Sequence, residues 1–256
     1  MIISSDDNAK IKHLKKLQLK KYREEFGEFL VENLVIIQDA LAAGYKPISL
    51  FVSDEFLIKN REVVTAIANQ SNLSDWFEIN LKINKSFSNL DHPAGICAVY
   101  KKPTLKPISY DQSILYLNSI GDPGNLGTIF RSAVAFGFKD IILDETCVDV
   151  YNFKTIAAAK DTIFKININY DKNFTLLNKM KGQLPIVSTI MNKADNINDL
   201  NKLKNFCLVL GDESRGVDKN IEKIADKFIK INISPDIESL NVASAAAIIL
   251  HSVYNK

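Results

Sequence analysis

Three groups of polar side chains follow apolar, β-prone runs in this sequence of 256 residues. The groups are Asn125 with Arg131, Glu213 with Arg215, and Ser239 with Asn241. In open α/β sheets, ligands bind beyond the carboxyl ends of the strands. Amide, guanidinium, carboxylate and hydroxyl groups that converge at such an edge predict one ligand-binding site built from distant segments of the chain.

Each group alone also has a purely structural interpretation. Asn125 or Ser239 suits the cap of a helix, and Arg131 suits an exposed helix face. The glycines of residues 121–127 match neither the G-x-G-x-x-G fingerprint nor a phosphate-binding loop that ends in Gly-Lys-Ser/Thr. Asp144 nevertheless lies about twenty residues further on, where dinucleotide folds place a ribose-binding acid. A dinucleotide enzyme therefore stays open as an alternative.

A strand, a turn, a helix and a second strand must position the first group. Residues 114–127 form an apolar strand and a glycine-rich turn, residues 128–138 form the helix, and residues 141–143 start the next strand. Such a βαβ unit builds parallel sheets. Asn125 and Arg131 are six residues apart, which does not place them on one helix face, so a shared role requires Asn125 to lie before the helix.

The whole chain alternates predicted strands and helices, which indicates an α/β fold with a mostly parallel sheet. Residues 1–100 form a smaller α/β module, residues 101–112 form a linker with two prolines, and residues 113–256 form the larger domain. Residues 8–23 are basic without an acid and carry apolar side chains at a spacing of three. They predict one amphipathic helix that contacts a phosphate backbone or faces solvent.

Composition limits the function classes. A net charge of +2 means that any nucleic-acid affinity must come from a local patch. Three widely spaced cysteines and three scattered histidines argue against a disulfide framework and against a zinc site. No apolar run approaches the about 18 residues of a membrane span, and the N-terminus lacks the apolar region of a signal peptide. We expect a cytoplasmic protein that uses no metal.

Three motifs, in order along the chain, resemble those of the SPOUT superfamily of RNA methyltransferases, in its SpoU/TrmH branch. Residues 122–127 together with Arg131 resemble the first motif, residues 208–216 the second, and residues 231–243 the third. The combination is far more specific than any one loop. The resemblance covers residues 113–254.

The resemblance implies transfer of a methyl group from S-adenosylmethionine to a ribose 2′-hydroxyl in structured RNA. It also implies a C-terminal deep trefoil knot and a homodimer. Residues 29–32 and 93–96 resemble the ribosomal-protein-like, RNA-binding substrate domain that often precedes this catalytic domain. That two-domain layout favours rRNA over tRNA as the substrate by analogy.

The resemblance also assigns site residues. Those assigned to catalysis are Asn125, Arg131, Glu213, Ser239 and Asn241. Those assigned to the cofactor are Thr189, Gly211, Ile231 and Leu240. An arginine is rarely a base, since its pKa exceeds about 12. We therefore expect Arg131 to stabilise the developing alkoxide.

This sequence departs from the family pattern in two places. Asp212 and Ser214 stand where the second motif usually has asparagine and glycine. Ala157, Ala159 and Asp161 stand where the family usually has a basic residue, a serine and a glycine. These departures keep a second alternative open, a non-catalytic RNA-binding protein that retained the fold.

Overall fold

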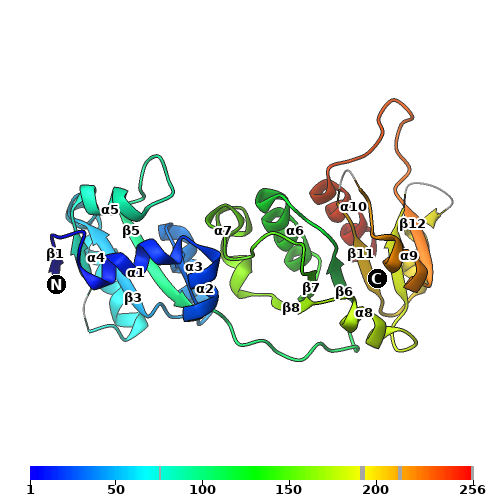
Figure 1. Cartoon of the computed structure of the whole chain (residues 1–256), viewed down its shortest axis with the longest axis horizontal. Coiled ribbons are helices and arrows are strands. Elements are labelled where there is room, and N and C mark those ends of the chain that lie inside the picture. The colour runs from blue at the N-terminus through cyan, green and yellow to red at the C-terminus, as the bar shows by residue number, and fades with distance from the viewer. Residues whose placement is uncertain (75, 191–193, 213–214, 255–256) are drawn as a thin grey trace. The chain divides into compact units, whose positions relative to one another are not determined.

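The computed structural model describes residues 1–74, 76–190, 194–212 and 215–254 (Figure 1). The chain divides into two compact units. Unit 1 comprises Met1–Thr104 and Tyr151–Phe164, and unit 2 comprises Leu105–Val150 and Lys165–Lys256. A segment from the second half of the chain therefore belongs to the first unit. The functional domain limits given above remain a prediction.

The described residues of unit 1 build a five-stranded sheet in the order β1-β4-β3-β5-β2. Its strands are β1 (Ile2–Ile3), β2 (Glu28–Val31), β3 (Ser49–Ser53), β4 (Phe77–Ile79) and β5 (Ile96–Lys101). β5 runs antiparallel to both β2 and β3, so this sheet is mixed. The helices of unit 1 are α1 (Ala9–Leu17), α2 (Lys20–Phe26), α3 (Leu34–Ala42), α4 (Asp54–Ser71), α5 (Leu81–Phe87), α7 (Phe153–Ala159) and the 3₁₀-helix η1 (Lys160–Phe164).

The basic segment predicted as one helix is two helices. α1 buries Ile11, Leu14 and Leu17, as their spacing of three predicts. Leu19 has an extended backbone, is exposed, and separates α1 from α2. The buried Arg23 of α2 turns back, and its Nη1 donates to the carbonyl oxygen of Leu17 at 2.6 Å. The guanidinium thus satisfies a carbonyl at the end of α1, which lets the helix stop there.

The described residues of unit 2 build a seven-stranded sheet in the order β10-β12-β9-β11-β6-β7-β8. Its strands are β6 (Ile114–Leu117), β7 (Asp140–Asp144), β8 (Asn167–Asp171), β9 (Ile186–Thr189), β10 (Asp195–Asn196), β11 (Cys207–Leu210) and β12 (Lys227–Lys230). All of their pairings are parallel. The helices are α6 (Pro123–Ala135), α8 (Thr175–Met180), the 3₁₀-helix η2 (Ile197–Lys202), α9 (Lys219–Ile224) and α10 (Val242–Tyr254). The predicted α/β fold with a mostly parallel sheet is confirmed.

Helix α6 begins earlier than predicted. Asp122 caps it, because the backbone N–H of Asn125 donates to Asp122 Oδ1 at 2.7 Å. Pro123 occupies the first helical position, where its fixed φ suits the helix and its missing N–H costs nothing. Gly137, with a φ of +83°, follows the helix and allows the left-handed backbone of its end. The predicted turn at residues 121–127 is therefore largely helix, and Asn125 lies inside α6.

The centre of unit 2 is apolar on both faces of the sheet. Strands β6 and β11 are buried along their whole length, as expected for parallel strands covered on both sides. α6 and α10 pack against each other (Figure 1). Among the described residues, no helix is long and apolar enough to cross a membrane.

Candidate active site

Four neighbouring strands of unit 2, in the order β12-β9-β11-β6, end at one edge of the sheet. Thr189 closes β9 and pairs with Ile229 of β12. Its Oγ1 donates to the carbonyl oxygen of Val209 in β11 at 3.2 Å. Gly211 follows β11 directly, and Ile231 follows β12. Three of the four predicted cofactor residues therefore lie at the ends of adjacent strands.

The turn after β11 closes tightly on its own backbone. Asp212 and Gly216 form an antiparallel bridge, with the N–H of Gly216 donating to the carbonyl oxygen of Asp212 at 2.9 Å. A Cβ on Gly211 would lie 2.3 Å from the carbonyl oxygen of Gly216, so only glycine fits there. The predicted catalytic Glu213, with Ser214 beside it, lies outside the described residues.

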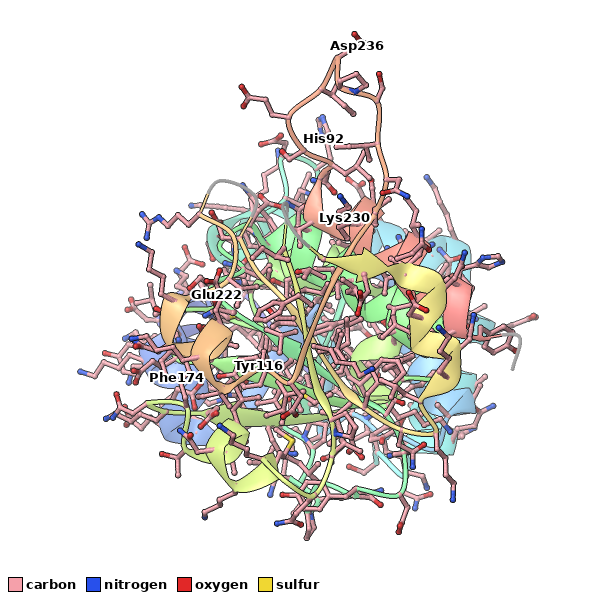
Figure 2. All side chains as sticks on the ribbon, turned by 90° about the vertical axis from the view of Figure 1, so that its right-hand side faces the viewer. His92, Tyr116, Phe174, Glu222, Lys230 and Asp236 are labelled. Carbon is pink, nitrogen blue, oxygen red and sulfur yellow. The ribbon has the colours of Figure 1, made fainter. Side chains whose placement is uncertain are left out.

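The third motif lies on a long loop between β12 and α10. The loop leaves the sheet at Lys230 and projects away from it to a tip at Asp236 (Figure 2). On the return to α10, Ser239 is exposed and Leu240 is half-buried. Asn241 is exposed at the foot of the loop, directly before α10.

A hydrogen bond joins the first and third motifs. Asn241 Nδ2 donates to Asn125 Oδ1 at 2.9 Å, across 116 positions of sequence. Asn241 Oδ1 accepts from the backbone N–H groups of Ala243 and Ser244, at 3.0 and 3.2 Å. Asn241, and not Ser239, therefore caps the last helix. The structure thus brings Asn125 and Asn241 together, and their assignment to catalysis stays a prediction.

Arg131 lies in the middle of α6 and is exposed. The condition that Asn125 precede the helix is not met, because both residues are inside α6. Six steps of about 100° place their side chains about 120° apart around the helix axis. Arg131 therefore has to reach any shared substrate from a different face of α6 than Asn125.

Asn118, the first residue after β6, forms a clamp that no sequence pattern predicted. Its side-chain NH₂ donates to Asp144 at the end of β7, and its Oδ1 accepts from the backbone N–H of Asp218 at 2.8 Å. Asn118 and Asp144 are 2% and 6% exposed. The clamp therefore fixes the chain where it returns from the Gly211 turn. A polar residue that ends an apolar strand is the signal that could have revealed it.

Asp144 has no carboxylate oxygen to spare for a ribose. One oxygen accepts from the backbone N–H groups of Thr146 and Cys147, both at 3.0 Å. The other accepts from Asn118 and from the backbone N–H of Ser119 at 3.1 Å. This structural role removes the main support for a dinucleotide enzyme. Burial, and then the nearby Asp144 charge, raise the pKa of the Cys147 thiol well above its usual range.

The SpoU rRNA Methylase family matches residues 112–251, more than half of the chain. The chain belongs to the SpoU rRNA methylase family. Its residues 8–98 match the MRM3-like substrate binding domain. The family predicted from the three motifs is confirmed, and so are the enzyme class, an RNA methyltransferase, and the cofactor class, S-adenosylmethionine.

Several relatives of this SpoU family chain are similar over nearly their full length. The 23S rRNA (guanosine(2553)-2′-O)-methyltransferase RlmP of Bacillus subtilis is 28% identical over 250 residues, covering 97% of each chain. A crystal structure of an RNA 2′-O ribose methyltransferase is 28% identical with a TM-score of 0.82, covering 100% of this chain and 98% of that one. An AdoMet-bound rRNA methyltransferase from Sinorhizobium meliloti is 25% identical with a TM-score of 0.85, covering 100% and 97%.

The strand ends of this SpoU family chain fit a cofactor such as S-adenosylmethionine. Ile231, directly after β12, and Leu240, on the loop before α10, are half-buried apolar residues. The Thr189 hydroxyl and the peptide groups around Gly211 offer hydrogen-bonding groups at the same edge of the sheet. Among the described residues, no group of three or more His, Cys, Asp or Glu side chains could hold a metal ion.

Proposed function

We propose that this protein transfers the methyl group of S-adenosylmethionine to a ribose 2′-hydroxyl in structured rRNA. One observation carries the proposal. In a chain of the SpoU family, the hydrogen bond between Asn125 and Asn241 joins the first and third motifs. The names of the relatives support rRNA as the substrate and the ribose 2′-oxygen as the acceptor.

The chemical difficulty is the acceptor, because an alcohol is a poor nucleophile at neutral pH. When bound, S-adenosylmethionine supplies a methyl group already activated by its sulfonium. The protein must then align the ribose oxygen and lower the cost of losing its proton. Arg131 contributes a planar guanidinium with five N–H donors. We assign it the stabilisation of the developing alkoxide and a grip on the adjacent phosphate.

The remaining polar residues orient the reactants. The side-chain NH₂ of Asn241 donates to the side-chain oxygen of Asn125, which holds the start of α6 next to the start of α10. In this proposal Ser239, which is exposed on the loop between β12 and α10, completes the ribose pocket, and Glu213 orients Arg131. Thr189, Gly211 and Ile231 at the strand ends, and Leu240 on the loop before α10, hold the cofactor in this proposal, largely through backbone groups.

The test is methylation of a confirmed substrate RNA by Arg131→Ala. That RNA is found by mapping ribose methylation in a deletion strain and its parent. We expect a loss of at least about 100-fold in kcat, as for removal of an oxyanion-stabilising donor, with little change in S-adenosylmethionine affinity. Arg61→Ala, at an exposed position of α4, is the matched control. Unchanged methylation by Arg131→Ala would remove Arg131 from the mechanism.

Unit 1 contributes an RNA-binding surface in this proposal. Exposed lysines of α1 and α2 supply positive charge next to the aromatic rings of Tyr22 and Phe26, and Lys16 Nζ lies 5.2 Å from the Tyr22 ring centroid. We expect alanine at four lysines to weaken RNA binding and to flatten its salt dependence, by about 0.7–0.9 in the log–log slope for each RNA phosphate that the protein no longer neutralises. Three of them, Lys16, Lys20 and Lys21, are exposed, and the fourth, Lys15, is half-buried and pairs with Asp6 at 3.7 Å. An unchanged slope of log affinity against log salt concentration would show that this surface does not bind RNA.

The knot, the homodimer and the cytoplasmic location implied by the resemblance are also proposals. Support for a knot is that α10, at the end of the chain, packs beside α6 near the start of unit 2. Support for a dimer is the exposure of Ile248 and Tyr254 on α10. Light scattering gives the mass in solution, and a monomer at all concentrations would reject the dimer. Covalent closure of unit 2 followed by denaturation tests the knot, because only a knotted ring stays more compact than an unknotted one.

A further inference from the structure

Helix α7 and the residue that ends it carry a short row of exposed side chains. In the segment Tyr151–Phe164, which belongs to unit 1, the exposed residues are Lys154, Ala157 and Lys160. Residues three apart are neighbours on a helix surface, so the two lysines flank the methyl group of Ala157, about 9 Å apart along the helix axis. The one acid of this segment, Asp161, is half-buried. We call these three exposed residues the lysine row.

The two charges of the lysine row are not neutralised within the chain. Among the described residues, neither Lys154 nor Lys160 forms an ion pair. The Lys154 ammonium lies 5.9 Å from the centroid of the Phe153 ring, which leaves its N–H donors open to solvent. By contrast, Lys102 of the same unit pairs with Glu24 at 2.8 Å. The lysine row therefore offers two unpaired cations to a partner that carries negative charge.

Lys160 has a strained backbone. Its φ of +58° and ψ of −138° form a conformation that glycine adopts easily and that residues with a side chain rarely adopt. The fold holds this conformation from both sides. The Lys160 N–H donates to the carbonyl oxygen of Ile156, and the hydroxyl of the buried Thr162 donates to the carbonyl oxygen of Ala159 at 2.5 Å. A lysine at a position where glycine would relieve strain points to a use of its side chain.

The lysine row lies close to the basic helices of unit 1. Leu17 and Gln18, at the end of α1, line one hollow of the surface together with Ala157 and Lys160. The lysines of α1 and α2 are the RNA-binding surface proposed above, so the lysine row adds positive charge beside that surface. A nucleic-acid strand carries one negative charge per nucleotide at regular spacing. Such a strand matches a row of separated lysines, and the short side chain of Ala157 leaves room for it between them.

We propose that Lys154 and Lys160 neutralise two phosphates of the RNA substrate, whose backbone passes over Ala157. The inference rests on the proposed function, because it takes RNA as the substrate. It adds to unit 1 a contact from a segment far along the sequence from α1 and α2. It also gives a reason for a lysine at a position of backbone strain, because the side chain of residue 160 is then used in binding.

Fluorescence anisotropy of a fluorescein-labelled RNA hairpin, titrated with the full chain at several salt concentrations, measures this contact. Alanine at both Lys154 and Lys160 should lower the affinity by about fivefold per lysine at about 0.1 M salt. The slope of log affinity against log salt concentration should flatten by about 0.7–0.9 for each phosphate released. Lys59→Ala, at an exposed position of α4, removes a charge elsewhere in unit 1 and should keep the affinity and the slope.

Three substitutions at Lys160 separate its charge from its backbone strain. Lys160→Arg keeps both and should bind the hairpin as the wild-type chain does. Lys160→Ala removes the charge and keeps the strain, so it should weaken binding and leave the melting temperature nearly unchanged. Lys160→Gly removes both, so it should weaken binding while the melting temperature, measured by circular dichroism, rises by roughly 2–6 °C. A lysine with a purely structural role would not give these opposite changes.

Wild-type affinity and slope after both lysines are replaced would overturn this contact and leave the RNA-binding function intact. An equal loss in Lys59→Ala would overturn it too, because binding would then depend on total charge alone. A lower melting temperature of Lys160→Gly would give Lys160 a structural role instead. Displacement of the hairpin from the wild-type chain by millimolar inorganic phosphate at constant ionic strength would assign the lysine row to a free anion. No binding of the hairpin by the wild-type chain would reject the RNA-binding function together with the contact.

Discussion

Substitution of Gly211 by alanine tests whether the turn after β11 must keep its shape to bind the cofactor. A Cβ there would lie 2.3 Å from the oxygen and 2.4 Å from the carbon of the Gly216 carbonyl, and 2.5 Å from the Val217 nitrogen. All three are backbone atoms, so no rotation of a side chain relieves the contact. The turn has to open, which also breaks the hydrogen bond from Gly216 N–H to the Asp212 carbonyl.

The magnitude follows from these two effects. Overpacking a tight contact costs about 1–3 kcal/mol, and breaking a backbone hydrogen bond costs about 0.5–1.5 kcal/mol. If the cofactor needs the closed turn, binding loses about 1.5–4.5 kcal/mol, which is a reduction in affinity of at least about tenfold. Gly216→Ala meets nothing within 4 Å but places alanine at φ +69°. Gly216→Ala should therefore weaken cofactor binding by a smaller free energy than Gly211→Ala does, about 1–2 kcal/mol.

Calorimetric titration with S-adenosylmethionine measures the effect directly. Gly121→Ala is the control, because a Cβ there meets nothing within 4 Å and the backbone has no left-handed φ. The order of affinity should be Gly121→Ala, then Gly216→Ala, then Gly211→Ala. An affinity of Gly211→Ala within twofold of wild type would show that the cofactor does not depend on this turn.

Three further predictions concern residues of unit 2 and the thiols. Asn118→Ala leaves the N–H of Asp218 without its acceptor and should destabilise unit 2 by about 1–3 kcal/mol in urea unfolding, and unchanged stability would reject the clamp. Asn241→Ala removes a helix cap and the bond to Asn125, for a combined loss of about 1–3 kcal/mol, and its methylation rate should fall more than its cofactor affinity. Burial raises the pKa of all three cysteine thiols, so they should resist iodoacetamide at pH 8 until the chain is denatured, and rapid native labelling would contradict their burial. These are Cys97, Cys147 and Cys207.

Short-range patterns predicted the elements well. The apolar runs became β6 and β11, and the spacing of Ile11, Leu14 and Leu17 placed all three in the core. The errors arose where one side chain decides a helix end. Asp122 starts α6 early by capping it, and Arg23 satisfies the end of α1. Such caps depend on side-chain geometry that periodicity does not encode.

Long-range pairings were predicted only where motif order supplied them. The three motifs led us to expect that their polar residues, Asn125 and Asn241 among them, converge at one site. The hydrogen bond from Asp218 N–H to Asn118 spans 100 positions, and no sequence pattern predicts it. The segment Tyr151–Phe164 joins unit 1 with aromatic packing, such as Phe164 on Tyr100 with ring centroids 5.0 Å apart. The apolar character of a residue does not reveal which other residue it packs against.

The hydrogen bond between Asn125 and Asn241 also sets an order of events during synthesis. Unit 1 has all of its residues once the chain has grown past Phe164, whereas the two asparagines can meet only after Asn241 has been made. Because domains generally fold from the N-terminus during translation, a growing chain would gain the proposed RNA-binding surface before the proposed methyl-transfer site. An unfinished or C-terminally truncated copy could then occupy the substrate without modifying it, and would act as an inhibitor of the complete enzyme.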